Sequence, residues 1–301
     1  MLDLAQRQIA CEDTLTRTPG IAASAAAAGG QPLSSTFVRA QLAPLNKSSP
    51  GYPGFERGPV KVYNSDAFAL ARTLGPASTS TDAEAADTHT TRGTAGAARS
   101  AKVGVLNLAS DQHPGGGWRY TLSKTQEEAL CYSSTLFATL KPEWYPFPNT
   151  GPGSCAGIVS PNVVVFKDTL DNDLVDLPVE QRHVVTVITV AAPCGPRLTA
   201  DGGDFADAGQ LNDLKEKILL VLRAAAVNGV TKLVLGAMGC GAYGCPPRVV
   251  ARLMREAIES EEFEGWFEDV VFAVYAAGPT GKENFEVFTE VFGGVDGAPG
   301  H

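Results

Sequence analysis

The stretch VGVLNLASDQHPGGGWRYTLSKTQEEAL, residues 103–130, contains the pattern that decides the fold. Its first part, residues 103–109, is a mostly apolar run, which is typical of a strand buried on both faces. Three glycines follow, Gly115-Gly116-Gly117, and a helical apolar pattern begins after Gln126-Glu127-Glu128. A buried strand joined to a helix through a glycine-rich loop predicts a layered α/β fold.

The same alternation continues to the end of the chain. Short apolar runs, mostly rich in β-branched residues, predict further strands at residues 163–166, 184–192, 233–237 and 270–276. Apolar residues at helical spacing predict helices over residues 125–140, 208–227, 247–262 and 285–292. The order of these elements indicates a central sheet between helices, with ligands bound at the carboxyl ends of the strands.

The N-terminal part of the chain is less regular. We expect a helix over residues 2–17, irregular segments at 21–31 and 44–59, and a short strand at 60–63. Ser65 is the expected cap of a helix over residues 66–74. An Ala/Thr/Ser-rich stretch then predicts a flexible insertion at 75–101. We therefore divide the chain into an accessory region (1–58), a main domain (59–293) and a tail (294–301).

Length and composition indicate a globular protein that can bury a sizeable core. The chain has 301 residues, of which 44% are hydrophobic, and no apolar run approaches the ~20 residues that a membrane helix needs. The first residues, MLDLAQR, lack the basic segment and apolar core of a secretory signal. We expect an intracellular protein, cytoplasmic or nuclear, that acts as a monomer without a membrane partner.

Cysteine spacing and net charge narrow the possible ligands. The six cysteines are scattered, and Cys240 and Cys245 have no histidine near them, so we expect buried thiols and neither a metal nor another cofactor. The net charge of −9 argues against direct binding of nucleic acid, which needs clustered Lys and Arg. A phosphate-bearing ligand held by backbone N–H groups stays open.

The glycines and glutamates of the opening stretch are the first candidate site. Three glycines after a strand allow a ligand to approach the backbone closely, although an ordinary flexible turn explains them equally well. Thr125 and Glu128 match a capping box, and in isolation this structural role is favoured over catalysis. Consecutive helical residues point about 100° apart, so Glu127 and Glu128 cannot perform the same task.

A second glycine-rich loop, Gly239-Cys240-Gly241-Ala242-Tyr243-Gly244, joins the strand at 233–237 to the helix that follows. A loop of this kind at a helix N-terminus favours an anion, although the Gly-Lys-Ser/Thr of a P-loop is absent. Tyr243 would stack on or bond to a sugar. The alternative is a tight connection with a tyrosine in the core.

Together these elements resemble the microbial-type poly(ADP-ribose) glycohydrolases, a branch of the macrodomain superfamily. The family signature is Gly-Gly-Gly, a spacer and Gln-Glu-Glu, which stand here at 115–117 and 126–128. The resemblance extends over most of residues 1–20 and 59–293. It implies a macrodomain-like three-layer α/β/α domain with a mixed, largely parallel sheet and an N-terminal helical extension. Two features differ from the usual pattern: the eight-residue spacer lacks a Gly-Ala pair, and His113 stands where Asn is commoner.

The resemblance also implies a role for each candidate residue. Glu128 would be the catalytic acid and base, while Glu127 and Gln126 would orient the ribose. Asn107 and the three glycines would line the ribose pocket, and residues 239–244 would hold the diphosphate, with Tyr243 against the terminal ribose. Tyr275 is a candidate for adenine contact.

The implied reaction is hydrolysis of ribose–ribose O-glycosidic bonds in poly(ADP-ribose), with ADP-ribose as product. The acidic net charge favours recognition of one or two terminal units, and therefore cleavage from the ends of the polymer. Its targets would be poly(ADP-ribosyl)ated proteins, and its role the reversal of ADP-ribosylation in the DNA damage response. Two alternatives stay open: hydrolysis of a single ADP-ribose linked to a protein side chain, and a non-catalytic ADP-ribose-binding module. Intact Glu127 and Glu128 favour hydrolysis.

Overall fold

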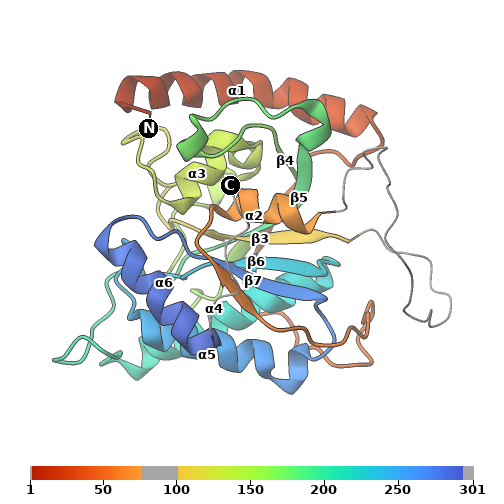
Figure 1. Cartoon of the computed structure of the whole chain (residues 1–301). Coiled ribbons are helices and arrows are strands. Elements are labelled where there is room, and N and C mark those ends of the chain that lie inside the picture. The colour runs from red at the N-terminus through yellow and green to blue at the C-terminus, as the bar shows by residue number, and fades with distance from the viewer. Residues whose placement is uncertain (1, 76–100, 294–301) are drawn as a thin grey trace.

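A seven-stranded sheet forms the centre of the computed structural model, which describes residues 2–75 and 101–293 (Figure 1). The strand order is β1-β4-β5-β3-β6-β7-β2. The strands β5, β3, β6, β7 and β2 are parallel, and β4 is antiparallel to both of its neighbours. The strands are β1 (Thr36–Val38), β2 (Lys61–Tyr63), β3 (Val103–Leu108), β4 (Gly157–Val165), β5 (His183–Val190), β6 (Lys232–Leu235) and β7 (Asp269–Ala273). The predicted mixed, largely parallel sheet is confirmed.

Helices cover both faces of this sheet (Figure 1). On one face lie α2 (Ala67–Leu74) and α3 (Gln126–Ser133), with α1 (Leu4–Ala27) packed against α3. The opposite face carries α4 (Ala208–Val227), α5 (Pro247–Glu259) and α6 (Gly278–Phe292). Short 3-10 helices in the described ranges are Leu136–Thr139, Pro142–Trp144, Leu170–Asn172, Val179–Gln181 and Glu261–Phe263. None of the described helices is long and apolar enough to cross a membrane.

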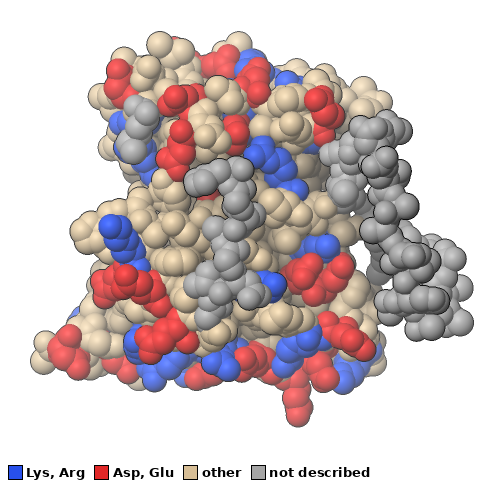
Figure 2. All heavy atoms as spheres, in the orientation of Figure 1, with Lys and Arg blue, Asp and Glu red and all other residues tan. Residues whose placement is uncertain are grey.

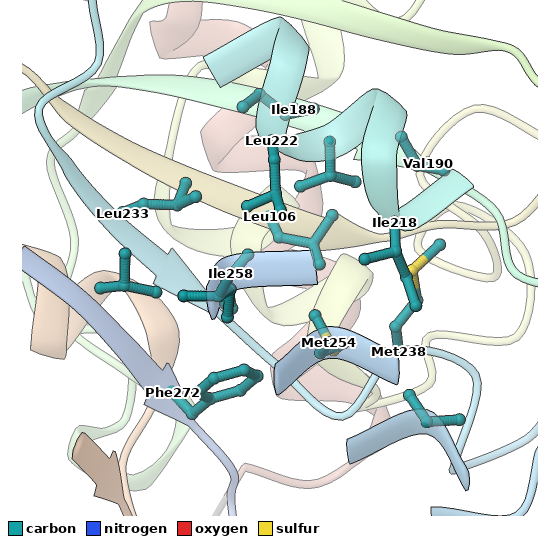
Figure 3. Packing of buried hydrophobic residues seen from close by; sticks show 14 of the residues in the cluster. Leu106, Ile188, Val190, Ile218, Leu222, Leu233, Met238, Met254, Ile258 and Phe272 are labelled. Atoms are coloured by element: carbon teal, nitrogen blue, oxygen red, sulfur yellow. The ribbon is translucent and has the colours of Figure 1, made fainter. Parts of the chain in front are cut away.

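The larger core lies between the sheet and α4 to α6 (Figure 3). Leu106 of β3 and Ile188 of β5 are buried together with Ile218 of α4 and Ile258 of α5. Full burial of one such side chain stabilises the fold by about 1.5–3 kcal/mol. The β-branched composition of the central strands therefore has the predicted cause, since both faces of the sheet are covered.

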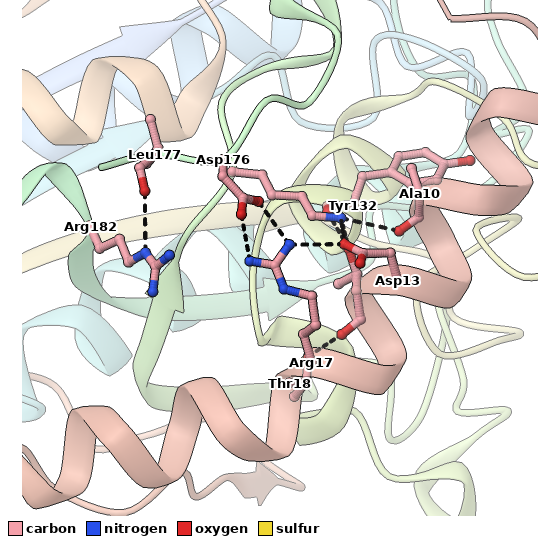
Figure 4. Close-up of polar contacts among 10 residues, drawn as sticks. Ala10, Asp13, Arg17, Thr18, Tyr132, Asp176, Leu177 and Arg182 are labelled. Carbon is pink, nitrogen blue, oxygen red and sulfur yellow. Dashed lines mark hydrogen bonds and ion pairs between the residues drawn. The ribbon is translucent and has the colours of Figure 1, made fainter. Parts of the chain in front are cut away.

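The N-terminal helix is held on the domain by a cluster of charged side chains (Figure 4). The ammonium of Lys167, only 4% exposed, lies 2.6 Å from a carboxylate oxygen of Asp13 and donates to the hydroxyl of Thr14 at 2.9 Å. Arg17 bridges Asp13 and Asp176 at 3.0 and 2.7 Å. Part of the N-terminal region thus packs directly on the domain, while the division of the chain at residue 58 stays a prediction.

Several predicted boundaries are wrong. The first helix does not end at residue 17 but continues through Pro19 to Ala27, because the alanines that follow favour helix. Asp66, not Ser65, caps α2, and its carboxylate accepts from the amides of Phe68 and Ala69. The helix expected over 125–140 ends at Ser133, since Ser134 is extended and pairs with Val165.

The remaining elements differ mainly in length. The strand predicted at 163–166 begins at Gly157 and has a register shift between Ser160 and Val163, where Pro161 interrupts the apolar pattern. The last helix begins earlier than residue 285, at Gly278, and α5 ends at Glu259 rather than 262. The flexible insertion and the tail expected at 75–101 and 294–301 lie almost entirely outside the described residues.

Candidate functional site

A cavity of about 810 Å³ opens at the carboxyl ends of the parallel strands. Leu108 at the end of β3, Val190 at the end of β5 and Ala273 at the end of β7 line its floor. Its volume lies within the range of about 300–1,000 Å³ that small-molecule sites have. The alternation of strands and helices predicts a ligand site at this edge of the sheet.

The glycine loop lies over the two glutamates. The Gly117 amide donates to Oε1 of Glu128 at 2.7 Å, and Gly116 has φ +58° in the left-handed region. A Cβ at Gly116 would lie 2.6 Å from Oε1 of Glu128 and 3.0 Å from Oε2 of Glu127. The backbone therefore approaches both carboxyls so closely that only glycine fits. Gly115 also has a positive φ but is buried against Phe137 and Cys131, outside the cavity lining.

The predicted capping box is absent. Thr125 precedes the first residue of α3, but its side chain accepts no backbone amide. Its hydroxyl instead donates to Oε2 of Glu128. Glu128 thus has one oxygen on the Gly117 amide and the other on the Thr125 hydroxyl, so both interactions hold its carboxyl at the cavity rather than close the helix end.

The carboxyl of Glu127 is buried and is bound by β3 and the residues that follow this strand. Its Oε2 accepts from the Ser110 amide at 2.7 Å, and its Oε1 accepts from Nδ2 of Asn107 at 3.3 Å. Burial raises the pKa of the Glu127 carboxyl to about 8, the charge of Glu128 adds to the rise, and the two donors oppose it. Asn107 is fully buried beneath Glu127 and does not line the cavity, contrary to the prediction.

Gln126 binds the backbone of β3. Its Oε1 accepts from the Leu108 amide at 2.8 Å and its Nε2 donates to the Leu106 carbonyl at 2.7 Å. β6 pairs with β3 only as far as Val105, so the Gln126 amide takes the place of the missing neighbour strand. Both ends of this side chain therefore fix α3 against the sheet, although Gln126 also lines the cavity.

The second glycine loop forms the opposite wall. Gly239, Gly241, Ala242 and Tyr243 line the cavity, whereas the buried Cys240 and the exposed Gly244 do not. Gly239 has φ +76°, and a Cβ there would lie 2.6 Å from the Cβ of Ala192. Tyr243 donates from its hydroxyl to Oδ1 of Asp111 at 2.7 Å and accepts from the Asp111 amide at 3.3 Å. The two loops are therefore tied to each other across the cavity.

Comparison with known proteins agrees with this geometry. Residues 56–168 match the family described as "Microbial-type PARG, catalytic domain". The poly(ADP-ribose) glycohydrolase of Thermomonospora curvata is 25% identical and superposes with a TM-score of 0.66 over 95% of this chain and 98% of its own. Residues 56–168 are therefore the catalytic domain of a microbial-type poly(ADP-ribose) glycohydrolase.

Related structures include complexes with small molecules. The structure of the Thermomonospora curvata glycohydrolase has also been solved with the inhibitor ADP-HPD. That structure is 25% identical to this chain and superposes with a TM-score of 0.66 over 94% of this chain and 98% of its own. The Deinococcus radiodurans glycohydrolase, solved with ADP-ribose, is 28% identical with a TM-score of 0.60 over 81% of this chain and 87% of its own. Comparison with curated proteins by sequence gave no match. The matched catalytic domain and the similar structures make this chain a glycosidase, with the reaction of a poly(ADP-ribose) glycohydrolase.

The far end of the glycohydrolase cavity is acidic. Tyr275, half exposed, donates from its hydroxyl to Oδ2 of Asp171, and both residues line the cavity. Asp66 lines it as well, and burial raises the pKa of its carboxyl. The sequence prediction includes Tyr275 but misses Asp66 and Asp171.

Four further lining or supporting residues are also absent from the prediction: Ser110, Asp111, Thr125 and Asn284. Ser110 and Asp111 directly follow a buried strand, which is a usable signal, because such positions lie at the ligand edge of the sheet. Asn284 belongs to a helix 40 residues beyond the second loop, and its amide donates to the Cys240 carbonyl. No sequence pattern connects these two segments.

Proposed function

We propose that this glycohydrolase removes ADP-ribose from the ends of poly(ADP-ribose), with Glu128 as general acid and then general base. The observation that carries the proposal is the pair of contacts on Glu128, from the Gly117 amide and the Thr125 hydroxyl. A hydroxyl can donate or accept, whereas an amide N–H only donates. Thr125 can therefore hold Glu128 in either protonation state, as a group that first gives and then takes a proton requires.

Glu127 would serve as a binding group. Its two oxygens accept from Ser110 and Asn107, which hold it in one orientation beneath the ribose position. Because its pKa is about 8, the glutamate pair holds a proton at neutral pH. The proton that the pair holds would be the one that Glu128 delivers to the departing oxygen, while Glu127 stays bound to Ser110 and Asn107.

The reaction follows from this arrangement. Glu128 protonates the 2′-oxygen of the departing unit while positive charge develops on the ribose carbon, and it then accepts a proton from the attacking water. The diphosphate, held by the backbone amides of residues 239–244, would stabilise that charge in place of a second carboxylate.

Charge favours action at chain ends. The net charge is −9, and on the face shown in Figure 2 Lys and Arg alternate with Asp and Glu, so a long polyanion has no continuous basic surface there. The cavity has the size for a terminal unit. The substrates would be poly(ADP-ribosyl)ated proteins, cleaved by a monomer inside the cell, where its six free cysteines stay reduced.

Incubation with automodified poly(ADP-ribose) polymerase tests the proposal. The expected product of the wild type is free ADP-ribose, and Glu128→Gln should lower the rate about 10³-fold, the range that general acid–base catalysis contributes. ADP-ribose affinity should persist in that variant. The control is Glu256→Gln, an exposed position on α5.

Three outcomes would contradict it. Release of only the protein-linked unit would indicate a mono-ADP-ribosyl hydrolase, and binding without turnover a non-catalytic module. Full activity of Glu128→Gln with loss of activity in Glu127→Gln would move the acid to the other glutamate.

A further inference from the structure

The loop over the glutamates presents a large aromatic side chain to solvent. Tyr120 is 76% exposed and lines the cavity. Two residues earlier, Trp118 is fully buried, with its ring 4.5 Å from that of Phe137 and 6.0 Å from that of Tyr132. Trp118 therefore anchors this loop in the core, while Tyr120 lies at the cavity without a hydrophobic cover.

A second ring lies beside it. The imidazole of His113 and the ring of Tyr120 have centroids 5.9 Å apart and planes inclined by 59°. His113 is also exposed and also lines the cavity. The two residues belong to the same loop but lie on opposite sides of the three glycines, so its fold brings them together.

Backbone hydrogen bonds fix this arrangement. The Gly116 amide donates to the His113 carbonyl at 3.1 Å, and the Tyr120 amide donates to the Gly117 carbonyl at 3.1 Å. Gly117 in turn holds Glu128 through its own amide. The two rings are thus supported by the same turn that positions the proposed acid, and they are preorganised for a ligand.

The chemistry of the scissile bond indicates which part of the polymer lies beside Tyr120 and His113. The departing 2′-oxygen belongs to an adenosine, so the ribose that leaves carries an adenine on its neighbouring carbon. The proposed function places the terminal unit in the cavity that Glu128, Gly239 and Tyr243 line. The adenosine of the departing unit must then lie on the open side of Glu128, where the glycine loop ends in exposed aromatic rings.

We propose that Tyr120 and His113 form a binding site for the adenosine of the departing ADP-ribose unit, a proposal that rests on the proposed function. Purine rings stack on aromatic side chains with little dependence on sequence or precise geometry. Lys124, four residues after Tyr120, also lines the cavity and is the only Lys or Arg among the described lining residues. Its charge fits the diphosphate that follows the adenosine.

Binding of an ADP-ribose dimer and of ADP-ribose to the Glu128→Gln protein, measured by calorimetry, tests this site. The dimer should bind about tenfold more tightly than ADP-ribose, as one stacked base contributes. Tyr120→Ala should abolish this preference and leave ADP-ribose affinity within twofold. Tyr120→Phe and Tyr120→Trp, which keep a ring, should retain it. Val179→Ala, at a residue 74% exposed elsewhere, is the surface control.

Two binding results would overturn the site: equal affinity for dimer and ADP-ribose in the Glu128→Gln protein, or an equal loss of both affinities in Tyr120→Ala. The second would assign Tyr120 to the terminal unit. A wild type that fails to release ADP-ribose from polymer, with the dimer preference intact, would overturn the proposed function and leave the binding site standing. Polymer hydrolysis with an unchanged KM in Tyr120→Ala would overturn the site alone.

Discussion

Arg7 of α1 donates from Nε to the main-chain carbonyl of Leu122, 2.7 Å away, and so joins the N-terminal helix to the loop that holds Glu128. Leu122 is buried and has φ +51°, a conformation that a branched residue rarely adopts. Its amide donates to the Gly117 carbonyl at 2.9 Å. Strained residues persist where their surroundings determine them, and here Arg7 supplies part of that constraint.

Replacement of this arginine should impair catalysis more than binding. Arg7→Gln removes a hydrogen bond from a charged donor, worth about 1.5–3 kcal/mol, and frees the loop whose Gly117 orients Glu128. We expect kcat to fall about fivefold while ADP-ribose affinity stays within twofold, because misplacement of a catalytic group lowers the rate rather than the affinity. Steady-state kinetics and calorimetry measure the two effects.

Gln8→Ala is the matched control, since Gln8 lies on the same helix, is exposed and bonds only to Glu12 in the described structure. Equal kcat values for Arg7→Gln and wild type would show that α1 has no part in positioning the loop.

Gly116→Ala should nearly abolish activity without unfolding the protein. The new methyl group would lie 2.6 Å from Oε1 of Glu128, which is closer than any real Cβ contact, so the carboxyl must move. Displacement of a catalytic group by about 1 Å costs on the order of 10²-fold in rate. The backbone penalty for alanine at positive φ is about 1–2 kcal/mol, which a domain of this size tolerates.

Gly202→Ala separates the two effects. Gly202 has φ +71°, and a Cβ added there would meet nothing within 4 Å, so this variant carries the same backbone strain without the contact. If both variants kept full activity at similar melting temperatures, the close approach of Gly116 to Glu128 would have no catalytic importance.

Much of the sheet could be predicted because its strands are buried on both faces. Residues 103–109 and 184–192 are mostly apolar runs, and the structure places them as the adjacent strands β3 and β5. Elements whose limits depend on tertiary contacts were less predictable. The helix ends before Ser134, which pairs with Val165, thirty-one residues further along the chain, and no local sequence pattern predicts that pairing.

The site shows the same division. Gly116 and Glu128 became candidates through the family signature, because each alone has an ordinary structural explanation in a turn or a helix cap. The orientation of Thr125 is not recognisable, since its sequence context matches a capping box and only the neighbouring Gly117 amide decides where Glu128 points. The sequence also predicts that Asn107 lies on a buried strand. It does not predict the hydrogen bond from Asn107 to Glu127, because that contact depends on how α3 packs on the sheet.

Tyr243→Phe should weaken substrate binding. It removes the hydroxyl that joins the second loop to Asp111 and leaves a buried carboxylate with fewer partners. A lost hydrogen bond to a charged group costs about 1.5–3 kcal/mol, part of which appears as loosening of the two loops. We expect ADP-ribose affinity to fall roughly tenfold and kcat to change less than threefold. Tyr52→Phe, at a residue that does not line the cavity, is the control, and unchanged affinity in Tyr243→Phe would separate the loop contact from binding.

Glu127 should make the protein less stable as the pH rises. Burial raises its folded pKa to about 8 from 4.5, so the folded state binds a proton that the unfolded chain has released between these values. Stability from this group is therefore complete below about pH 4.5 and is lost progressively up to about pH 8. Glu127→Gln removes the titration, and its amide can donate to Oδ1 of Asn107, which is buried without a partner.

The melting temperatures of wild type and Glu127→Gln, measured from pH 5 to 8, test this linkage. Other groups near Glu127, among them Glu128 and Tyr145, are present in both proteins, so the difference between the two curves isolates Glu127 to first order. The melting temperature of the variant should increase steadily relative to that of the wild type as the pH rises. Parallel curves would mean that Glu127 is ionised throughout this range, and the glutamate pair would then carry no proton for Glu128 to use.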